Sequence, residues 1–288
     1  MSIQNLIYTA LKGFGMGAAN VVPGVSGGTI ALITGIYGKI VDSLSAFATP
    51  STWKALFKGR FKEFWQSIGG SFLLALGLGI VVSILSLAKL VTWALTAYPV
   101  LTWAFFFGLI VASAVYMLIP VKNWKAADFL MVALGLATGL AFCLLTPTQT
   151  PQTWWFYFIT GAVAICTMIL PGVSGSFIMQ IFGNYDIVLK ALDPSAFNFG
   201  VLVPLAAGAV VGILAFSKLL KWLLSRWERK TMLVLVGFVL GTLLKVWPWS
   251  DMAAVEAAGH GLQIPGAIVA CLLGGALVVL IQKVSAKR

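Results

Sequence analysis

Two copies of one short motif carry most of the groups in this sequence that could bind a ligand. Residues 23–28 read Pro-Gly-Val-Ser-Gly-Gly, and residues 171–176 read Pro-Gly-Val-Ser-Gly-Ser. In both copies the serine stands before an apolar run. At such a position a hydroxyl caps a helix, and the free N–H groups of the first turn attract an anion. The two motifs therefore predict a cradle for a phosphate or a carboxylate.

The predicted cradle combines side-chain hydroxyls and an amide with glycines that let a ligand approach the backbone. We expect it to consist of Asn20, Ser26, Gly27, Gly28, Thr29, Ser174, Gly175 and Ser176. One glycine-serine turn in a membrane protein is more often a kink or a close helix contact. Its occurrence in both halves of the chain favours a transport site, because transporters place discontinuous helices at the boundary between two repeats.

Residues for a catalytic or metal centre are scarce in this sequence. His260 is the only histidine, and Cys143, Cys166 and Cys271 stand apart within apolar runs. Hydrolysis of a phosphate ester normally draws on histidine, clustered acids or a metal, so a lipid phosphatase is the weakest hypothesis. We expect no catalytic residue, no metal site and no cofactor.

The motifs lie in a chain that is too apolar for a soluble protein, with 60% hydrophobic and 9% charged residues. A helix needs roughly 20 apolar residues to cross a hydrocarbon core of about 30 Å. Windows of this kind without any charge occur at 67–88, 99–119, 129–147, 199–217 and 261–282, and a further window at 231–249 is interrupted only by Lys245. We therefore predict six spans in an all-α polytopic membrane protein.

The motif repeat extends through most of the chain. Matches at a spacing of 148 positions include Gly35 with Gly183 and Tyr37 with Tyr185, and matches at 129 positions include Trp93 with Trp222 and Gly108 with Gly237. The spacings differ because a basic, aromatic stretch in the first half has no counterpart; we expect it to form a surface helix at 50–66. We divide the chain into 1–147 and 148–288, each with a hairpin, at 3–48 and 153–192, followed by three spans.

The distribution of basic residues predicts the topology. The formal net charge is +11, but most basic residues lie in short loops, so orientation in a membrane explains them better than nucleic acid does. If each hairpin returns to its starting side, residues 1–66, 120–128, 218–230 and 283–288 share one compartment and hold 16 of the 19 Lys and Arg residues. We place this side and both termini in the cytoplasm.

A hairpin plus three spans makes an odd number of crossings, so the two halves would be inserted in opposite orientations, as an inverted repeat. The hairpins could be re-entrant or pairs of full spans, and Pro-Gly at their tips favours the re-entrant form. We expect Asp42 and Asp186 to lie near the membrane interface, with gating or proton coupling as the alternative. Lys89 and Lys218 would contact lipid head groups or draw an anionic lipid toward the site.

The residues around the motifs resemble those of the bacterial polyprenyl-phosphate translocases. The resemblance rests on GMGAANVVPGVSGGT at 15–29, FFGLI at 106–110 and ILPGVSGS at 169–176, and it runs over essentially the whole chain. It implies a flippase of the bacterial inner membrane that returns undecaprenyl phosphate, a lipid carrier of cell-wall synthesis, from the outer to the inner leaflet. It also implies that Ser26, Gly27, Gly28, Ser174, Gly175 and Ser176 bind the substrate.

The second copy of the motif departs from the first, since Ser176 stands in the place of Gly28 and Phe177 in the place of Thr29. The two tips are therefore not expected to be equivalent. The same architecture could also serve a secondary transporter of a small soluble anion. Membrane lipids are expected partners, while homo-oligomerisation and coupling to protons or ions stay open.

Overall fold

The computed structural model describes residues 2–22, 25–148, 150–193 and 197–286, and within these ranges the regular structure is helical, without a strand. Five helices are long and apolar enough to cross a membrane. They are α6 (Gly70–Ala97), α7 (Pro99–Leu118), α8 (Ala126–Cys143), α12 (Phe199–Thr242) and α14 (Ile264–Ala286). The expectation of an all-α polytopic membrane protein is confirmed.

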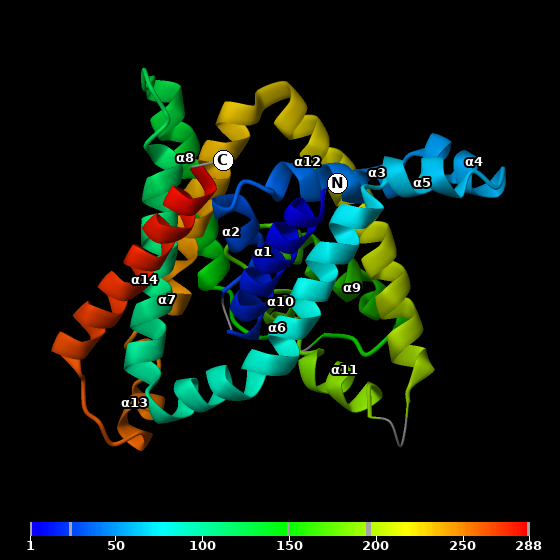
Figure 1. Ribbon diagram of the computed structural model, residues 1–288. Coiled ribbons are helices and arrows are strands. Elements are labelled where there is room, and N and C mark those ends of the chain that lie inside the picture. Colours follow the sequence, from blue (N-terminus) through cyan, green and yellow to red (C-terminus); the bar gives the residue numbers. More distant parts are fainter. Residues whose placement is uncertain (1, 23–24, 149, 194–196, 287–288) are drawn as a thin grey trace.

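The long helix α12 accounts for two of the six predicted spans. At 44 residues it would measure about 66 Å if it were straight, roughly twice the thickness of a hydrocarbon core. Its backbone leaves the helical region at Trp227, with φ −140° and ψ 51°. Figure 1 shows that α12 is bent, because it rises to the top of the view and then descends again. We call residues 199–226 its first limb and residues 228–242 its second limb.

Each motif region forms a long helix followed by two short ones. In the first half these are α1 (Ile3–Val21), α2 (Gly27–Ile33) and α3 (Tyr37–Phe47); in the second half they are α9 (Trp154–Ile169), α10 (Gly175–Ile181) and α11 (Tyr185–Ala191). The short helices α2 and α10 have 7 residues each, about 10 Å, and cannot cross a bilayer. The following helix α3 leaves α2 at 119°. This geometry favours re-entrant hairpins over pairs of full spans.

Helix ends repeat at the spacings seen in the sequence. The ends of α1 and α9 and the starts of α2 and α10, and of α3 and α11, are each 148 positions apart. Gly35 and Gly183 make the same turn in the left-handed region, with φ of 70° and 64°. Tyr98, between α6 and α7, has φ −134° and ψ 59°, close to the values of Trp227, which lies 129 positions later. The bend in α12 is therefore the counterpart of the α6–α7 junction.

Close helix contacts repeat in the same way. A Cβ on Gly108 of α7 would lie 2.0 Å from the carbonyl oxygen of Cys271 on α14, and one on Gly237 of the second limb would lie 2.2 Å from that of Val132 on α8. Glycine thus lets these backbones touch. Helix α7 of the first half packs against α14 of the second half, and the second limb of α12 packs against α8 of the first half. The helices of the two halves are therefore interleaved. In Figure 1, α6 and the first limb of α12 run in opposite directions; their insertion relative to a bilayer stays a prediction.

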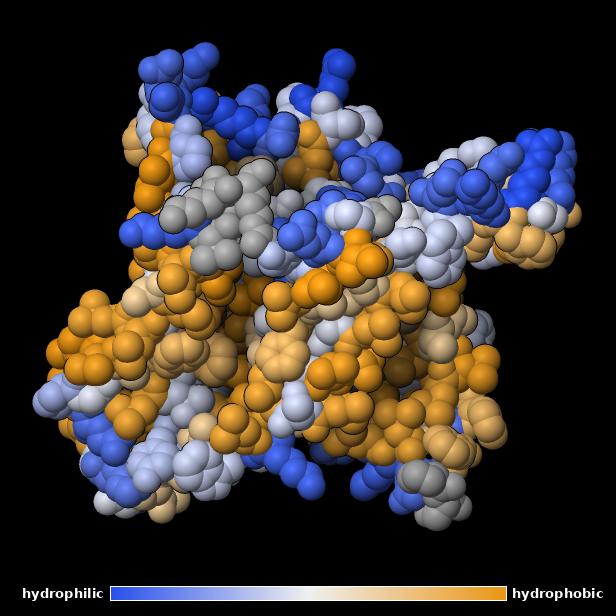
Figure 2. Space-filling model, in the orientation of Figure 1, coloured by the Kyte–Doolittle hydropathy of each residue, from blue (hydrophilic) through white to orange (hydrophobic). Residues whose placement is uncertain are grey.

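The segment expected as one surface helix forms two helices that project from the body, α4 (Pro50–Phe57) and α5 (Phe61–Ser67) (Figure 1). Gly59, with φ 73°, separates them. Phe57 and Phe61 are 83% and 69% exposed. Figure 2 shows a broad hydrophobic belt between hydrophilic ends, with the α4–α5 arm at the upper edge of the belt. An amphipathic arm at this height matches a helix pair lying in the interface.

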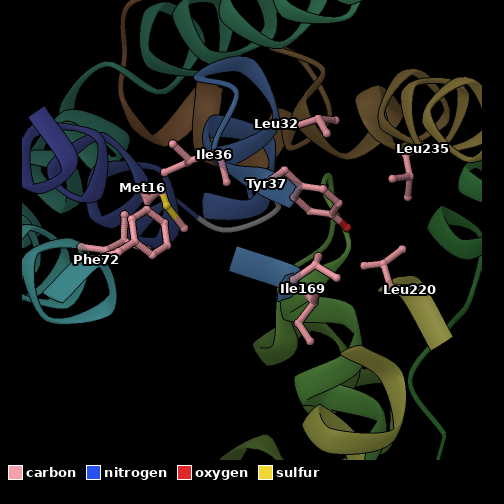
Figure 3. Close-up of a cluster of buried hydrophobic side chains, with 11 residues drawn as sticks. Met16, Leu32, Ile36, Tyr37, Phe72, Ile169, Leu220 and Leu235 are labelled. Carbon is pink, nitrogen blue, oxygen red and sulfur yellow. The ribbon is translucent and has the colours of Figure 1, made fainter. Parts of the chain in front are cut away.

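A buried hydrophobic cluster joins the two hairpins to α6 and α12. Its labelled members in Figure 3 are Met16, Leu32, Ile36, Tyr37, Phe72, Ile169, Leu220 and Leu235. The first half supplies most of them, while Ile169, Leu220 and Leu235 come from the second half. The cluster therefore fixes the first hairpin against the second at the level of the motifs.

Candidate functional site

The two motifs meet. The hydroxyl of Ser26 donates to the main-chain carbonyl of Leu170 at 3.3 Å, across 144 positions of sequence. A Cβ on Gly28 would lie 3.0 Å from the carbonyl oxygen of Ile169, so the start of α2 touches the end of α9. The structure therefore brings together the segments in which we expected the cradle, although Pro23 and Gly24 of the first motif lie outside the described residues.

The N–H groups of the first motif donate hydrogen bonds to side chains of the protein itself. The amide oxygen of Asn20 accepts from the N–H of Gly27 at 2.7 Å, and Ser26 accepts from the N–H of Gly28 at 3.1 Å. Ser26 and Thr29 are each only 2% exposed. In this conformation the first motif is closed, because the N–H groups expected to hold an anion already have partners.

The second motif is open. The hydroxyls of Ser174 and Ser176 lie 2.8 Å apart and share a hydrogen bond, and neither serine is fully buried. Ser174 makes no capping bond at the start of α10. Both side chains line a pocket with a volume of about 410 Å³, which we call the serine pocket. Gly175 is buried behind them, against Met168.

The serine pocket combines apolar walls with a few polar groups. The α6–α7 junction contributes Leu95, Pro99 and Trp103, and the end of α8 contributes Phe142. The polar groups are Ser174, Ser176, Gln180, Thr242, Lys245, Ser250 and Asp251. Asp251 caps α13 (Met252–Ala257), which lies at the lower left of the molecule in Figure 1. An apolar cavity with a small polar cluster is typical of a site for an amphiphilic ligand.

Lys245 is the only basic residue among the described residues that line the serine pocket. It belongs to η1 (Leu243–Val246), the short 3₁₀ turn that follows α12. Its ammonium group lies 4.6 Å from the centroid of the Phe177 ring, and in the described part of the chain it forms no ion pair. The sequence analysis noted Lys245 only as the one interruption of the apolar window at 231–249. The signal for a site was a lone lysine inside an otherwise apolar window.

The other candidate residues lie away from the serine pocket. Asp42 pairs with Lys221 at 3.0 Å, and both line a different pocket. Asp186 and Lys89 are exposed on the surface, and Lys218 lies beside the α4–α5 arm. Of the residues predicted for the cradle, the pocket thus contains Ser174 and Ser176.

An ion pair that the sequence analysis did not single out braces α8 against α12. Arg229, two residues after the bend, donates to both carboxylate oxygens of Asp128, at 2.6 Å and 3.1 Å. Arg229 also donates to the main-chain carbonyls of Lys122 and Asn123. Asp128 is 5% exposed and in turn accepts from the N–H of Lys125. This bidentate pair holds the start of the second limb in place.

Comparison with curated proteins identifies two relatives along most of the chain. The chain is 42% identical over 262 residues to a polyprenyl-phosphate transporter of Vibrio cholerae, covering 91% of this chain and 84% of that protein. It is 32% identical over 255 residues to a polyprenyl-phosphate transporter of Staphylococcus aureus, covering 83% of this chain and 85% of that protein. No solved structure matches the chain.

A family model described as undecaprenyl phosphate translocase-like matches residues 16–264, which include both motifs, the α6–α7 junction and the whole of α12. The match covers well over half of the chain, and both relatives exceed 30% identity. The resemblance inferred from the motifs is confirmed: this chain belongs to the undecaprenyl phosphate translocase-like family.

Proposed function

We propose that this protein transports a polyprenyl phosphate, undecaprenyl phosphate in the bacterial cell, from the outer to the inner leaflet of the cytoplasmic membrane. The names of both relatives support this substrate class. The observation that supports the proposal is the serine pocket, whose largely apolar lining includes the hydroxyls of Ser174 and Ser176, the ammonium group of Lys245 and one acid, Asp251. Two hydroxyls and an ammonium group match the oxygens of a phosphate.

The chemistry of the substrate explains why such a pocket is needed. A phosphate is costly to move through hydrocarbon, because an unpaired charge loses its hydration there. The long polyprenyl tail has no such cost and can stay in the lipid. A transporter therefore needs to enclose only the head group. The serine pocket, with a volume of about 410 Å³ and few polar groups, lies within the usual size range of ligand pockets.

In the proposed topology both termini face the cytoplasm and the halves are inserted in opposite orientations. Support comes from the 16 basic residues that this topology places on one side and from the opposite directions of α6 and the first limb of α12 (Figure 1). The serine pocket, beside the α6–α7 junction, then opens toward the outer leaflet. Ser174 and Ser176 would receive the lipid from that leaflet.

We propose transport without chemical change of the lipid. The named relatives are transporters, and their names do not favour the alternative of a small soluble anion. Rocking of one half against the other would carry the head group between the leaflets, as in other transporters built from repeats.

The test uses purified protein in liposomes that contain a fluorescent polyprenyl phosphate. We expect the protein to accelerate movement of the label between leaflets, measured as loss of fluorescence to a membrane-impermeant quencher. The double variant Ser174→Ala and Ser176→Ala should slow this movement. Ser86→Ala is the matched control, because Ser86 is exposed on α6 and bonds only within its own helix.

Two further probes separate the hypotheses. Fluorescent polyprenol, which lacks the phosphate, should not be moved, and the amount of lipid phosphate should stay constant. Movement no faster than in protein-free liposomes would overturn the proposal. Release of inorganic phosphate would indicate an enzyme, and protein-dependent efflux of a small anion such as inorganic phosphate would indicate the alternative transporter.

A further inference from the structure

A second pocket lies at the opposite end of the molecule from the serine pocket. It has a volume of about 430 Å³ and lies between the α2–α3 bend and the bend of α12, which is at the top of Figure 1. We call it the charged pocket because Asp42, Lys221 and Glu228 line it, together with Tyr37 and Ser225. None of these residues contributes to the serine pocket.

The two pockets are built from equivalent parts of the two halves. The α6–α7 junction lines the serine pocket with Leu95, Pro99 and Trp103, and the residues 129 positions later, Leu224, Glu228 and Met232, line the charged pocket. On the facing wall, Gln180 of the serine pocket corresponds to Leu32 of the charged pocket, 148 positions earlier. Each pocket therefore combines a bend from one half with a motif hairpin from the other half.

A buried hydroxyl in the charged pocket lacks a partner. Tyr37 is 4% exposed, and none of the described residues forms a hydrogen bond with its hydroxyl. Figure 3 shows the hydroxyl directed away from Met16 and Phe72, toward the side on which Leu220 and Leu235 lie. A buried hydroxyl without a partner is costly, so such groups normally form a hydrogen bond with another protein group or an ordered water. Its position in this pocket points to a ligand with acceptor oxygens.

The charge arrangement favours a ligand that binds briefly. Lys221 pairs with Asp42 at 3.0 Å, but their side chains are 52% and 62% exposed, so water weakens the pair. Lys221 can therefore exchange Asp42 for a phosphate oxygen. With the second acid, Glu228, the pocket holds more negative than positive groups, and these acids would repel a phosphate once Asp42 reclaims Lys221.

The described residues of the first motif, near the charged pocket, are buried in this conformation. Ser26 and Gly28 correspond to Ser174 and Ser176 of the serine pocket, yet Ser26 is 2% exposed and Gly28 is buried. Thr29, also 2% exposed, has a hydroxyl without a partner among the described residues. Opening of the charged pocket would extend it to these hydroxyls, as the serine pocket already extends to Ser174.

We infer that the charged pocket is the exit half-site for the lipid phosphate, in which Tyr37 and Lys221 contact the head group after Asp42 has released Lys221. The inference rests on the proposed function and adds a second binding site at the other face of the membrane. The lipid would load at Ser174, Ser176 and Lys245 and leave past Tyr37 and Lys221. Asp42 would act as the competitor that displaces it.

The experiment separates loading from transfer with fluorescent polyprenyl phosphate. We expect Lys221→Gln and Tyr37→Phe to bind the lipid within about twofold of the unmodified protein but to move it between leaflets roughly tenfold more slowly, the scale of one lost charged hydrogen bond. Lys245→Gln should instead weaken binding itself. Lys230→Gln is the matched control, because Lys230 is an exposed lysine on α12 outside both pockets.

The outcomes distinguish this inference from the proposed function. If the unmodified protein moves the lipid and Lys221→Gln and Tyr37→Phe move it as fast as Lys230→Gln does, the exit half-site is wrong and the transport function stands. If the unmodified protein moves no lipid, the proposed function fails first. Asp42→Asn provides a further check, since removal of the competitor should slow release while Lys221 stays able to bind phosphate.

Discussion

The hydroxyl of Ser26 donates to the main-chain carbonyl of Leu170 and at the same time accepts from the N–H of Gly28. One side chain thus caps α2 and ties the first motif to the segment that precedes the second. Because Leu170 directly follows α9, the hairpin helix of the other half, a movement of one hairpin against the other must break or shift this bond. Ser26 is therefore both a structural cap and a contact that would change during transport.

Replacement of Ser26 by alanine removes both bonds and leaves the buried N–H of Gly28 without a partner. We expect Ser26→Ala to destabilise the protein by about 1–2 kcal/mol. Intrinsic tryptophan fluorescence during thermal unfolding in detergent would measure this loss. Ser26→Thr keeps a hydroxyl and should restore most of the stability, and equal melting temperatures for Ser26→Ala and the unmodified protein would contradict the capping role.

Lys245 supplies the positive charge of the serine pocket, so its replacement should weaken binding of the phosphate and leave the tail unaffected. We expect Lys245→Gln to reduce affinity for a polyprenyl phosphate roughly tenfold. Lys245→Arg keeps the charge and should retain more of it. Titration of the purified variants with fluorescent lipid measures the affinities. A polyprenol without phosphate is the control, and a similar loss for both lipids would show that the variant acts by disturbing the fold.

The bidentate pair between Arg229 and Asp128 should contribute to stability because the carboxylate is almost completely buried. We expect Asp128→Asn to cost about 1–3 kcal/mol, since it weakens the bonds that hold Arg229. Unfolding in a series of denaturing detergent mixtures would measure the change. Glu63→Gln is the comparison, because the Arg60–Glu63 pair is more than half exposed and should contribute less than about 1 kcal/mol.

A methyl group on Gly237 would collide with the carbonyl oxygen of Val132 on α8, at 2.2 Å. We expect Gly237→Ala to separate α8 from the second limb of α12 and to cost about 1–3 kcal/mol. Gly77→Ala provides the opposite case, since Gly77 lies in α6 with open space around its Cα. That variant should be neutral or slightly stabilising. Equal stabilities in the same detergent series would contradict the close contact.

The topology predicts which loops share a compartment. Single cysteines at Lys58 and Arg226, in a background without the native cysteines, should react with an impermeant thiol reagent from the cytoplasmic side only. A cysteine at Lys190 should react from the outside. Labelling that places Lys58→Cys and Arg226→Cys in different compartments would overturn the opposite insertion of the halves.

Much of the architecture could be predicted because membrane spans and repeats are encoded locally. A charge-free window of about 20 residues must form a helix that satisfies its own backbone in lipid. The spacings of 148 and 129 positions, visible as matched glycines and aromatic residues, recur in the helix ends and in the bend at Trp227. The prediction of one surface helix at 50–66 missed the break at Gly59, because a single positive φ in a polar turn leaves little trace in composition.

The site could be predicted only in part. The sequence singled out Ser174 and Ser176, because a repeated glycine-serine motif is a local signal, and the structure places both in the lining of the serine pocket. That they bind the lipid stays a prediction. Only the tertiary structure decided that Asn20 and Ser26 close the first motif, that Lys245 joins the second, and that a charged pocket forms between α3 and α12. The physical reason is that these contacts join segments far apart in the chain, and their geometry depends on how the interlocked helices pack rather than on any single stretch of residues.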